Sequence, residues 1–325
     1  MNGSLLKHIR MLKILADALV PIFAGLLLGY LAGLSRRMEN QNVQTLITFV
    51  MSFAVPSALF LPIASTPFRV LRQYTAPAFV MAIVYLVVYV VSLFWVRIRE
   101  NLRPSDSSVV ALTLAFPNSA AVGLPLLASA FGPQATVTVA ISLAIGCITI
   151  SPITLAILEA SRRSDGGSFA LRNVGLALIH SIKKPIVWSP LLGVVFSYGG
   201  LHLPSFIQRS LAVMGSAADG SALVLTGLVV SAQKFEIGET TLAAVFLKNA
   251  LQPALALGLA LLIHLPVELM RYIIVISAIP CGFFGVVFGK GFDSNPKLAS
   301  SGLIASYVIG IGTLAAWIVI VNHLG

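Results

Sequence analysis

The sequence predicts an all-α integral membrane protein, in which ten transmembrane helices form two inverted five-helix repeats with broken, crossing fourth and ninth helices. Hydrophobic residues make up 58% of the 325 positions and charged residues only 10%, whereas a soluble domain carries about 25% charge. The apolar residues gather into runs of about 20 or more, which is the length that crosses a bilayer as a helix. Because lipid cannot hydrogen-bond to the backbone, such runs must form helices rather than open strands.

Ten apolar runs follow one another along the chain, separated by short polar segments. The first run comes after three basic residues, which imitates a signal peptide, but it continues to about Leu34 without a small-x-small cleavage site before a soluble domain. We therefore expect it to be the first transmembrane helix. The predicted spans are residues 14–34, 43–63, 74–96, 108–131, 134–158, 174–200, 205–232, 241–263, 268–290 and 301–323.

The chain divides in the middle, at its longest polar connection. Residues 1–160 are expected to form the first five-helix repeat, and residues 185–325 the second. Between them, we expect residues 161–184 to form a cytoplasmic linker, whose amphipathic basic stretch lies along the membrane surface.

The distribution of Lys and Arg predicts the orientation, because cytoplasmic loops carry an excess of both. With the N-terminus outside, seven basic residues face outward: Lys7, Arg10, Lys13, Arg69, Arg72, Arg209 and Arg271. Thirteen then face the cytoplasm: Arg36, Arg37, Arg97, Arg99, Arg103, Arg162, Arg163, Arg172, Lys183, Lys184, Lys234, Lys290 and Lys297. We therefore expect both termini outside the plasma membrane, which is the inner membrane in a bacterium. The net charge of +10 is then a topology signal, and no nucleic-acid partner is expected.

Similar residues recur in the two halves, in the same order and at nearly one offset. Because five is an odd number, a second five-helix unit enters the membrane from the opposite side, which makes the repeat an inverted one. Inverted repeats give many secondary transporters their two alternating openings. The matching positions are Gly25 and Tyr30 with Gly193 and Tyr198, Ser57-Ala58-Leu59 with Ser221-Ala222-Leu223, Arg72 and Pro77 with Lys248 and Pro253, and Pro117 with Pro280.

The fourth span is predicted to be interrupted. Pro117 and Pro125 each remove a backbone donor, and Gly123 loosens the chain between them. A helix broken there exposes peptide groups at mid-depth, which lipid cannot satisfy but a substrate or water in a protein cavity can. Asn118 adds a donor and an acceptor at the break, and Ser119 adds a hydroxyl, although serines also simply let membrane helices pack closely.

The ninth span contains a matching interruption, Ala-Ile-Pro-Cys-Gly-Phe-Phe-Gly over residues 278–285. Two broken helices in inverted halves would cross near the bilayer centre, and the N-termini of their second halves would offer partial positive charge to an anion. The alternative is that the prolines only kink two ordinary helices. Their pairing in the repeat favours a substrate site, whose predicted residues are Pro117, Asn118, Ser119, Gly123, Pro280, Cys281 and Gly282.

Two charged residues lie within apolar runs, where charge is costly and often functional. Lys248 in the eighth span is a candidate cation for a carboxylate substrate, unless its side chain reaches the inner membrane surface. Asp219 in the seventh span is a candidate for a coupling proton or cation, unless it pairs with a basic residue. Cys147 and Cys281 lie inside apolar runs, and no ligand-like spacing predicts a metal site or a cofactor.

Three motifs resemble the auxin efflux carrier family of bacterial and plant transporters. They are Pro-Asn-x-x-x-x-Gly-x-Pro over residues 117–125, Lys-Asn-x-x-x-Pro over 248–253, and the interrupted segment of the ninth span. The similarity covers essentially the whole chain, and Gly-Ser-Ala-Leu at 220–223 resembles the malonate-carrier branch. The resemblance implies a ten-helix carrier for small organic anions, with crossing fourth and ninth helices, and a homodimer.

The sequence departs from the plant auxin exporters at one crossing proline. The family resemblance implies an Asn after each of these prolines, and Asn118 fits, whereas Cys281 occupies the second position. The loss of one amide puts auxin-like recognition in question and leaves a smaller carboxylate, such as malonate, as the alternative substrate.

We therefore expect a secondary active transporter of small organic anions that works by alternating access in the lipid bilayer. The sequence contains no nucleotide-binding motif, so ATP-driven transport within this chain is not expected. An anion channel is the alternative, because broken helices also build pores. A membrane-embedded enzyme is less favoured, since it would need clustered acidic residues or a His-Glu metal pattern, and only Asp17, Asp219 and scattered histidines are available.

Overall fold

The computed structural model describes residues 20–21, 23–35, 43–163, 183–232 and 236–324. Within these residues every regular element is a helix, and six helices are long and apolar enough to cross a membrane. The all-α membrane class is therefore confirmed for the described part of the chain. The count of ten spans, the inverted repeat and the division at residues 161–184 stay predictions, since most of the predicted linker lies outside the described residues.

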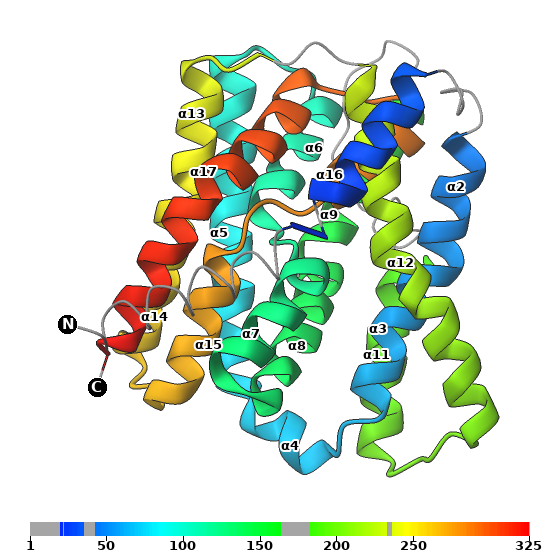
Figure 1. Cartoon of the computed structure of the whole chain (residues 1–325), viewed down its shortest axis with the longest axis vertical. Helices are drawn as coiled ribbons and strands as arrows, with labels where there is room; N and C mark the ends of the chain where they lie inside the picture. Colours follow the sequence, from blue (N-terminus) through cyan, green and yellow to red (C-terminus); the bar gives the residue numbers. More distant parts are fainter. Residues whose placement is uncertain (1–19, 22, 36–42, 164–182, 233–235, 325) are drawn as a thin grey trace.

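Among the described residues, helices occupy the predicted spans, and the predicted fourth, fifth and ninth spans each consist of more than one helix (Figure 1). The second and eighth spans each contain a π-helical turn, labelled η, between two α-helices. The elements that matter below are the helix Phe23–Leu34, α2 (Val43–Phe49), η2 (Val50–Ala54), α3 (Val55–Ala64), α5 (Thr75–Arg99), α6 (Pro104–Ala115), η3 (Ser119–Gly123), α7 (Leu124–Phe131), α8 (Thr136–Ile148), α9 (Ile150–Arg163), α11 (Pro185–Tyr198), α12 (Ser205–Ser231), α13 (Glu239–Phe246), η5 (Leu247–Leu251), α14 (Gln252–Leu262), α15 (Val267–Ala278), α16 (Phe284–Gly291) and α17 (Lys297–Asn322).

The three π-helical turns have a common cause in the sequence. Each ends two residues before a proline: η2 before Pro56, η3 before Pro125 and η5 before Pro253. A proline ring cannot donate to the carbonyl four residues earlier and clashes with it, so the helix widens by one residue there. The carbonyl that Pro253 cannot reach, that of Asn249, instead accepts a hydrogen bond from the Trp317 indole at 3.0 Å.

The helices form two groups that lie side by side in Figure 1. The smaller group, called here the panel group, contains the helix Phe23–Leu34, the α2–α3 span, α11 and α12. The larger, called the crossing group, contains α5 to α9 and α13 to α17. The two groups contact each other mainly where α3 and α11 pack on α8 and where α12 packs on α16.

Glycines hold the first helix of the panel group against α12. A Cβ atom added to Gly29 would lie 2.0 Å from the carbonyl oxygen of Val224, and one added to Gly227 would lie 2.0 Å from that of Leu26. The two backbones are therefore in direct contact, which small residues allow in membrane helix pairs. This seam explains the glycines at 25, 29 and 33, of which only Gly25 was singled out from the sequence, as a repeat marker.

We expect Gly227→Ala to destabilise the protein, because the added methyl group would force the two backbones apart at a cost of about 1 to 3 kcal/mol. The matched control is Gly220→Ala on the same helix, where a Cβ atom would meet nothing within 4 Å. Thermal unfolding of the purified protein measures both. A lower midpoint for Gly227→Ala with an unchanged one for Gly220→Ala is the expected result, and equal midpoints would contradict the seam.

Candidate substrate site at the helix crossing

Both predicted interruptions are present, and both have the same local cause. The residue before a proline avoids the helical conformation, and here Phe116 before Pro117 has φ −96° and ψ 109°, while Ile279 before Pro280 has φ −60° and ψ 139°. The helix α6 therefore ends at Ala115 and α15 at Ala278. Helical structure resumes with η3 and with α16.

The two interruptions contact each other through their backbones. The Asn118 N–H donates to the Pro280 carbonyl at 3.0 Å, and the Gly282 N–H donates to the Phe116 carbonyl at 2.6 Å, forming a short antiparallel bridge. A Cβ atom at position 282 would lie 2.6 Å from the Phe116 oxygen, so glycine is required there. The predicted meeting of the two breaks is confirmed, but these peptide groups bond to each other rather than standing free for a ligand.

The polar side chains at the fourth-span break are buried and paired. The Asn118 amide donates to the Tyr307 hydroxyl on α17 at 2.5 Å. The Ser119 hydroxyl bonds to that of Ser142 on α8 at 2.7 Å, and Ser142 bonds to the Tyr85 hydroxyl on α5 at 2.7 Å. Each break residue is thus held by a different helix of the crossing group, which makes the break rigid.

At the ninth-span break, Cys281 is held through its backbone. Its N–H donates to the Ser306 hydroxyl on α17 at 3.1 Å, and that hydroxyl donates to the Asn249 amide oxygen at 2.7 Å. The Asn249 amide nitrogen returns a hydrogen bond to the Ser306 carbonyl at 2.9 Å. Cys281 itself is completely buried with its thiol free.

Lys248 is completely buried in the crossing group and does not reach a membrane surface. Its ammonium nitrogen lies 2.8 Å from the Gln252 amide oxygen and 3.0 Å from the Ser277 carbonyl, near the C-terminal end of α15. Gln252 in turn donates to the Ala115 carbonyl, the last residue of α6, at 2.9 Å. Lys248 and Gln252 thus contact the C-terminal ends of α15 and α6, where carbonyl groups favour a cation.

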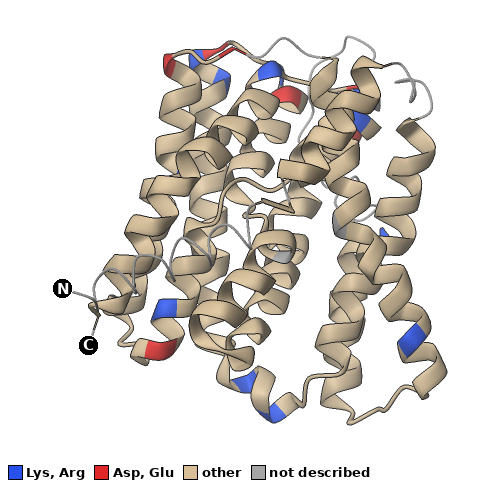
Figure 2. Cartoon of the chain, in the orientation of Figure 1, with Lys and Arg blue, Asp and Glu red and all other residues tan. Residues whose placement is uncertain are grey.

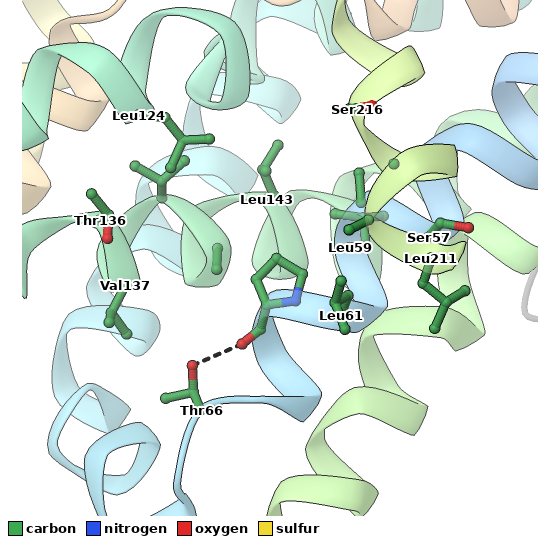
Figure 3. Close-up of a pocket in the computed structure, with 16 residues that line it drawn as sticks. Ser57, Leu59, Leu61, Thr66, Leu124, Thr136, Val137, Leu143, Leu211 and Ser216 are labelled. Atoms are coloured by element: carbon green, nitrogen blue, oxygen red, sulfur yellow. Dashed lines mark hydrogen bonds between the residues drawn. The ribbon is translucent and has the colours of Figure 1, made fainter. Parts of the chain in front are cut away.

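A cavity of about 370 Å³ lies beside the crossing, between α3 and α12 on one side and α7 and α8 on the other (Figure 3). We call it the crossing pocket. Leu124, the first residue of α7 after η3, lines it, and so does Leu143, next to the Ser142 that holds Ser119. Its remaining lining is apolar except for four hydroxyl-bearing side chains, those of Ser57, Thr66, Thr136 and Ser216.

The predicted substrate-site residues are absent from the lining of this pocket. Of the repeat positions singled out from the sequence, Ser57, Ala58 and Leu59 line the pocket directly. Pro117, Asn118, Ser119, Gly123, Pro280, Cys281, Gly282 and Lys248 do not contribute to the lining of this pocket. Asp219 belongs to α12, but its side chain lies outside the described residues, so its coupling role stays a prediction.

Sequence reasoning missed several residues of this site. Tyr85, Ser142, Gln252, Ser306 and Tyr307 are single polar residues in apolar runs, a pattern that is common in membrane helices and indicates no role by itself. Asn249 carried a usable signal, since it follows Lys248 in the motif that resembles the auxin efflux carriers.

The apolar helices, the two interrupted spans that meet and the solute-sized cavity between two helix groups define an integral membrane protein of the transporter class. Comparison with known sequences gives the family. The chain belongs to the family described as membrane transport protein, whose sequence model matches residues 14–318. The family predicted from the sequence motifs is thereby confirmed.

The relatives come from bacteria and plants. The uncharacterized transporter YfdV of Escherichia coli K12 is 27% identical over 312 residues, which cover 95% of this chain and 98% of that protein. Auxin efflux carrier component 8 of Arabidopsis thaliana is 22% identical over 350 residues, covering 93% and 95% of the two chains. Auxin efflux carrier component 7 of the same plant is 28% identical over 137 residues, or 40% of this chain and 22% of the relative.

Proposed function

We propose that this membrane transporter is a secondary active carrier of small organic anions, which bind in the crossing pocket and reach the two membrane faces by alternating access. The observation that carries the proposal is the contact between two interrupted helices, one from each half of the chain, directly beside a cavity between two helix groups. Interrupted helices at mid-depth are the usual position of transporter substrate sites. The plant relatives named as auxin efflux carriers support an organic acid as the class of substrate.

An inverted repeat underlies the proposed mechanism, and the packing of equivalent glycines supports it. Gly25 contacts Leu223 on α12, whereas its predicted equivalent Gly193 on α11 contacts Ile63 on α3. The first helix thus packs on α12 as α11 packs on α3, which is the pairing that a twofold relation between the halves would produce. A homodimer and both termini outside belong to the same proposal.

The orientation rests on the charges at the ends of the helices. Figure 2 shows most charged residues at the two ends of the molecule. Arg97, Arg99 and Arg103 lie where α5 ends and α6 begins. The excess of basic residues at this end supports placing it on the cytoplasmic side.

The lining of the crossing pocket favours a monocarboxylate with an apolar body. In this structure each of its four hydroxyl groups donates to a nearby backbone carbonyl, and by turning toward the cavity these groups would suit one carboxylate. No ionisable side chain among the described residues lines the pocket, so the second carboxylate of malonate would be buried without a cation. Burying an unpaired charge costs several kcal/mol or more. An auxin-like weak acid therefore suits this pocket better than a dicarboxylate.

The test is counterflow in proteoliposomes loaded in turn with unlabelled indole-3-acetate, benzoate or malonate. Saturable uptake of the same labelled acid against its gradient is expected for a carrier, and fastest for a monocarboxylate. Single-channel conductance without counterflow would favour the channel alternative instead. The absence of both for all acids would reject organic anions as the substrate class.

We expect Ala140→Phe to abolish this counterflow, because Ala140 lines the crossing pocket and a benzyl group there would fill the space of the substrate. The matched control is Ala254→Phe, which places the same group on an exposed position of α14 outside the pocket. Initial uptake rates per molecule of inserted protein measure both variants. Full counterflow in Ala140→Phe would exclude the crossing pocket as the substrate site.

A further inference from the structure

A second cavity lies along the same boundary between the two helix groups, toward the other end of the α2–α3 span. Its volume is about 280 Å³, and it is lined from one side by α2 and η2 and from the other by α9, the start of α11 and the end of α16. We call it the α2 pocket. Residues 44–52 of the span line this pocket, whereas residues 57–66 line the crossing pocket. The two cavities therefore have no lining residue in common.

The α2 pocket differs from the crossing pocket in its charge, because Arg162 and Lys184 both line it. The Lys184 ammonium forms an ion pair with Glu159 at 2.8 Å and lies 5.1 Å from the centre of the Phe292 ring. Among the described residues, Arg162 takes part in none of the ion pairs, and its side chain is exposed. Within the described part of the chain, these two cations and one carboxylate leave one excess positive charge, which belongs to Arg162.

The remaining lining of the α2 pocket has two kinds of surface. Met51, Phe288 and Phe292 provide apolar and aromatic area, and Gln44 and Thr48 provide polar groups from one helix face. A guanidinium group binds a carboxylate through two parallel hydrogen bonds. A cavity with one such cation beside aromatic rings thus matches an anion whose body is apolar.

We propose that the α2 pocket is a second binding site for small organic carboxylates, with the carboxylate on the Arg162 guanidinium and the apolar body against Met51 and Phe292. This site does not depend on the crossing pocket or on the transport mechanism proposed above. It gives the transporter two sites of different chemistry along one boundary: a charged one, and one lined by apolar and hydroxyl-bearing side chains.

The experiment is photoaffinity labelling of the full-length protein in phosphatidylcholine nanodiscs with 4-benzoylbenzoate, a monocarboxylate that inserts into nearby C–H bonds under light. Mass spectrometry of the labelled peptides separates the two sites. We expect label in the segments around residues 44–52 and 287–292. In Arg162→Gln that label should fall about tenfold or more, since a charge-assisted hydrogen bond is lost.

Two further variants control for charge and for space. Arg97→Gln removes an exposed arginine that does not line the α2 pocket, and it should keep full labelling. Thr48→Trp fills the pocket without changing its charge and should prevent labelling. Equal labelling of wild type and Arg162→Gln would overturn the proposal.

Two further labelling experiments distinguish the α2 pocket from a lipid-binding site and from the crossing pocket. If phosphatidylglycerol in the nanodisc abolished the label, the occupant would be a lipid headgroup and the proposal would be wrong. Ala140→Phe should leave the label in the α2 pocket unchanged, since Ala140 belongs to the other cavity. Failure of the proposed transport function would therefore still leave Arg162-dependent labelling, and the two failures are distinguishable.

Discussion

Replacing Asn118 by alanine is expected to abolish transport of the substrate while the protein stays folded in the membrane. The Asn118 backbone joins the two interrupted helices, and its side-chain amide bonds to Tyr307 on α17. Removing the amide takes away the fixed polar group at the break and releases the chain that positions the start of α7. Because misplacement of a site by an ångström reduces function by about a hundredfold, we expect a loss of at least that size.

The measurement is the initial rate of counterflow in proteoliposomes, with the amount of inserted protein and its unfolding midpoint measured in parallel. The control is Tyr307→Phe, which removes the partner hydroxyl but leaves the amide at position 118. If the Asn118–Tyr307 hydrogen bond positions the start of α7, Tyr307→Phe lowers the rate as well, whereas it keeps most of its activity if the amide contacts the substrate directly. Wild-type rates in Asn118→Ala would refute the central role of this residue.

Replacing Lys248 by alanine is expected to cause the largest loss of stability. The side chain is completely buried, and its removal leaves a cavity and takes the hydrogen-bond donor from Gln252 and the Ser277 carbonyl. A cavity of this kind together with unsatisfied buried acceptors costs about 3 to 5 kcal/mol. We therefore expect a markedly lower unfolding midpoint and little protein in the membrane.

Lys248→Met separates the structural role of this lysine from its predicted role as a counter-charge. Methionine keeps most of the side-chain volume but removes the ammonium group. If the ammonium attracts the substrate anion, Lys248→Met should insert into the membrane but bind the transported carboxylate more weakly in an equilibrium binding assay. Unchanged affinity in a folded Lys248→Met protein would count against a counter-charge and leave the lysine as a packing residue.

The interruptions of the fourth and ninth spans could be predicted from the sequence because their cause is local. Pro117 and Pro280 remove a donor and restrict the residue before them, whatever the rest of the chain does. The partners of the breaks could not be predicted in this way. Ser142, Asn249 and Tyr307 are brought to the crossing by helices that are distant in sequence.

The lining residues of the two cavities could not be predicted from the sequence either. The crossing pocket is lined mainly by Leu, Val, Ala and Pro side chains, which look the same in a sequence whether they face lipid, another helix or a cavity. Arg162 was counted as a topology signal, and only the packing of α9 beside α2 places it in the α2 pocket. In the sequence, a basic residue at the end of a span looks the same whether it sets the membrane orientation or lines a pocket.

The amino-acid sequence alone determined that this protein lies in a membrane, to which family it belongs and where two of its helices break. Those properties follow from the transfer of apolar side chains into lipid and from the missing N–H of proline, and both act residue by residue. The tertiary structure decided that the broken ends satisfy each other, that Lys248 is bonded inside the crossing group and that cavities remain between the two helix groups. These depend on distances between helices, because a hydrogen bond or a cavity exists only once distant segments are packed together.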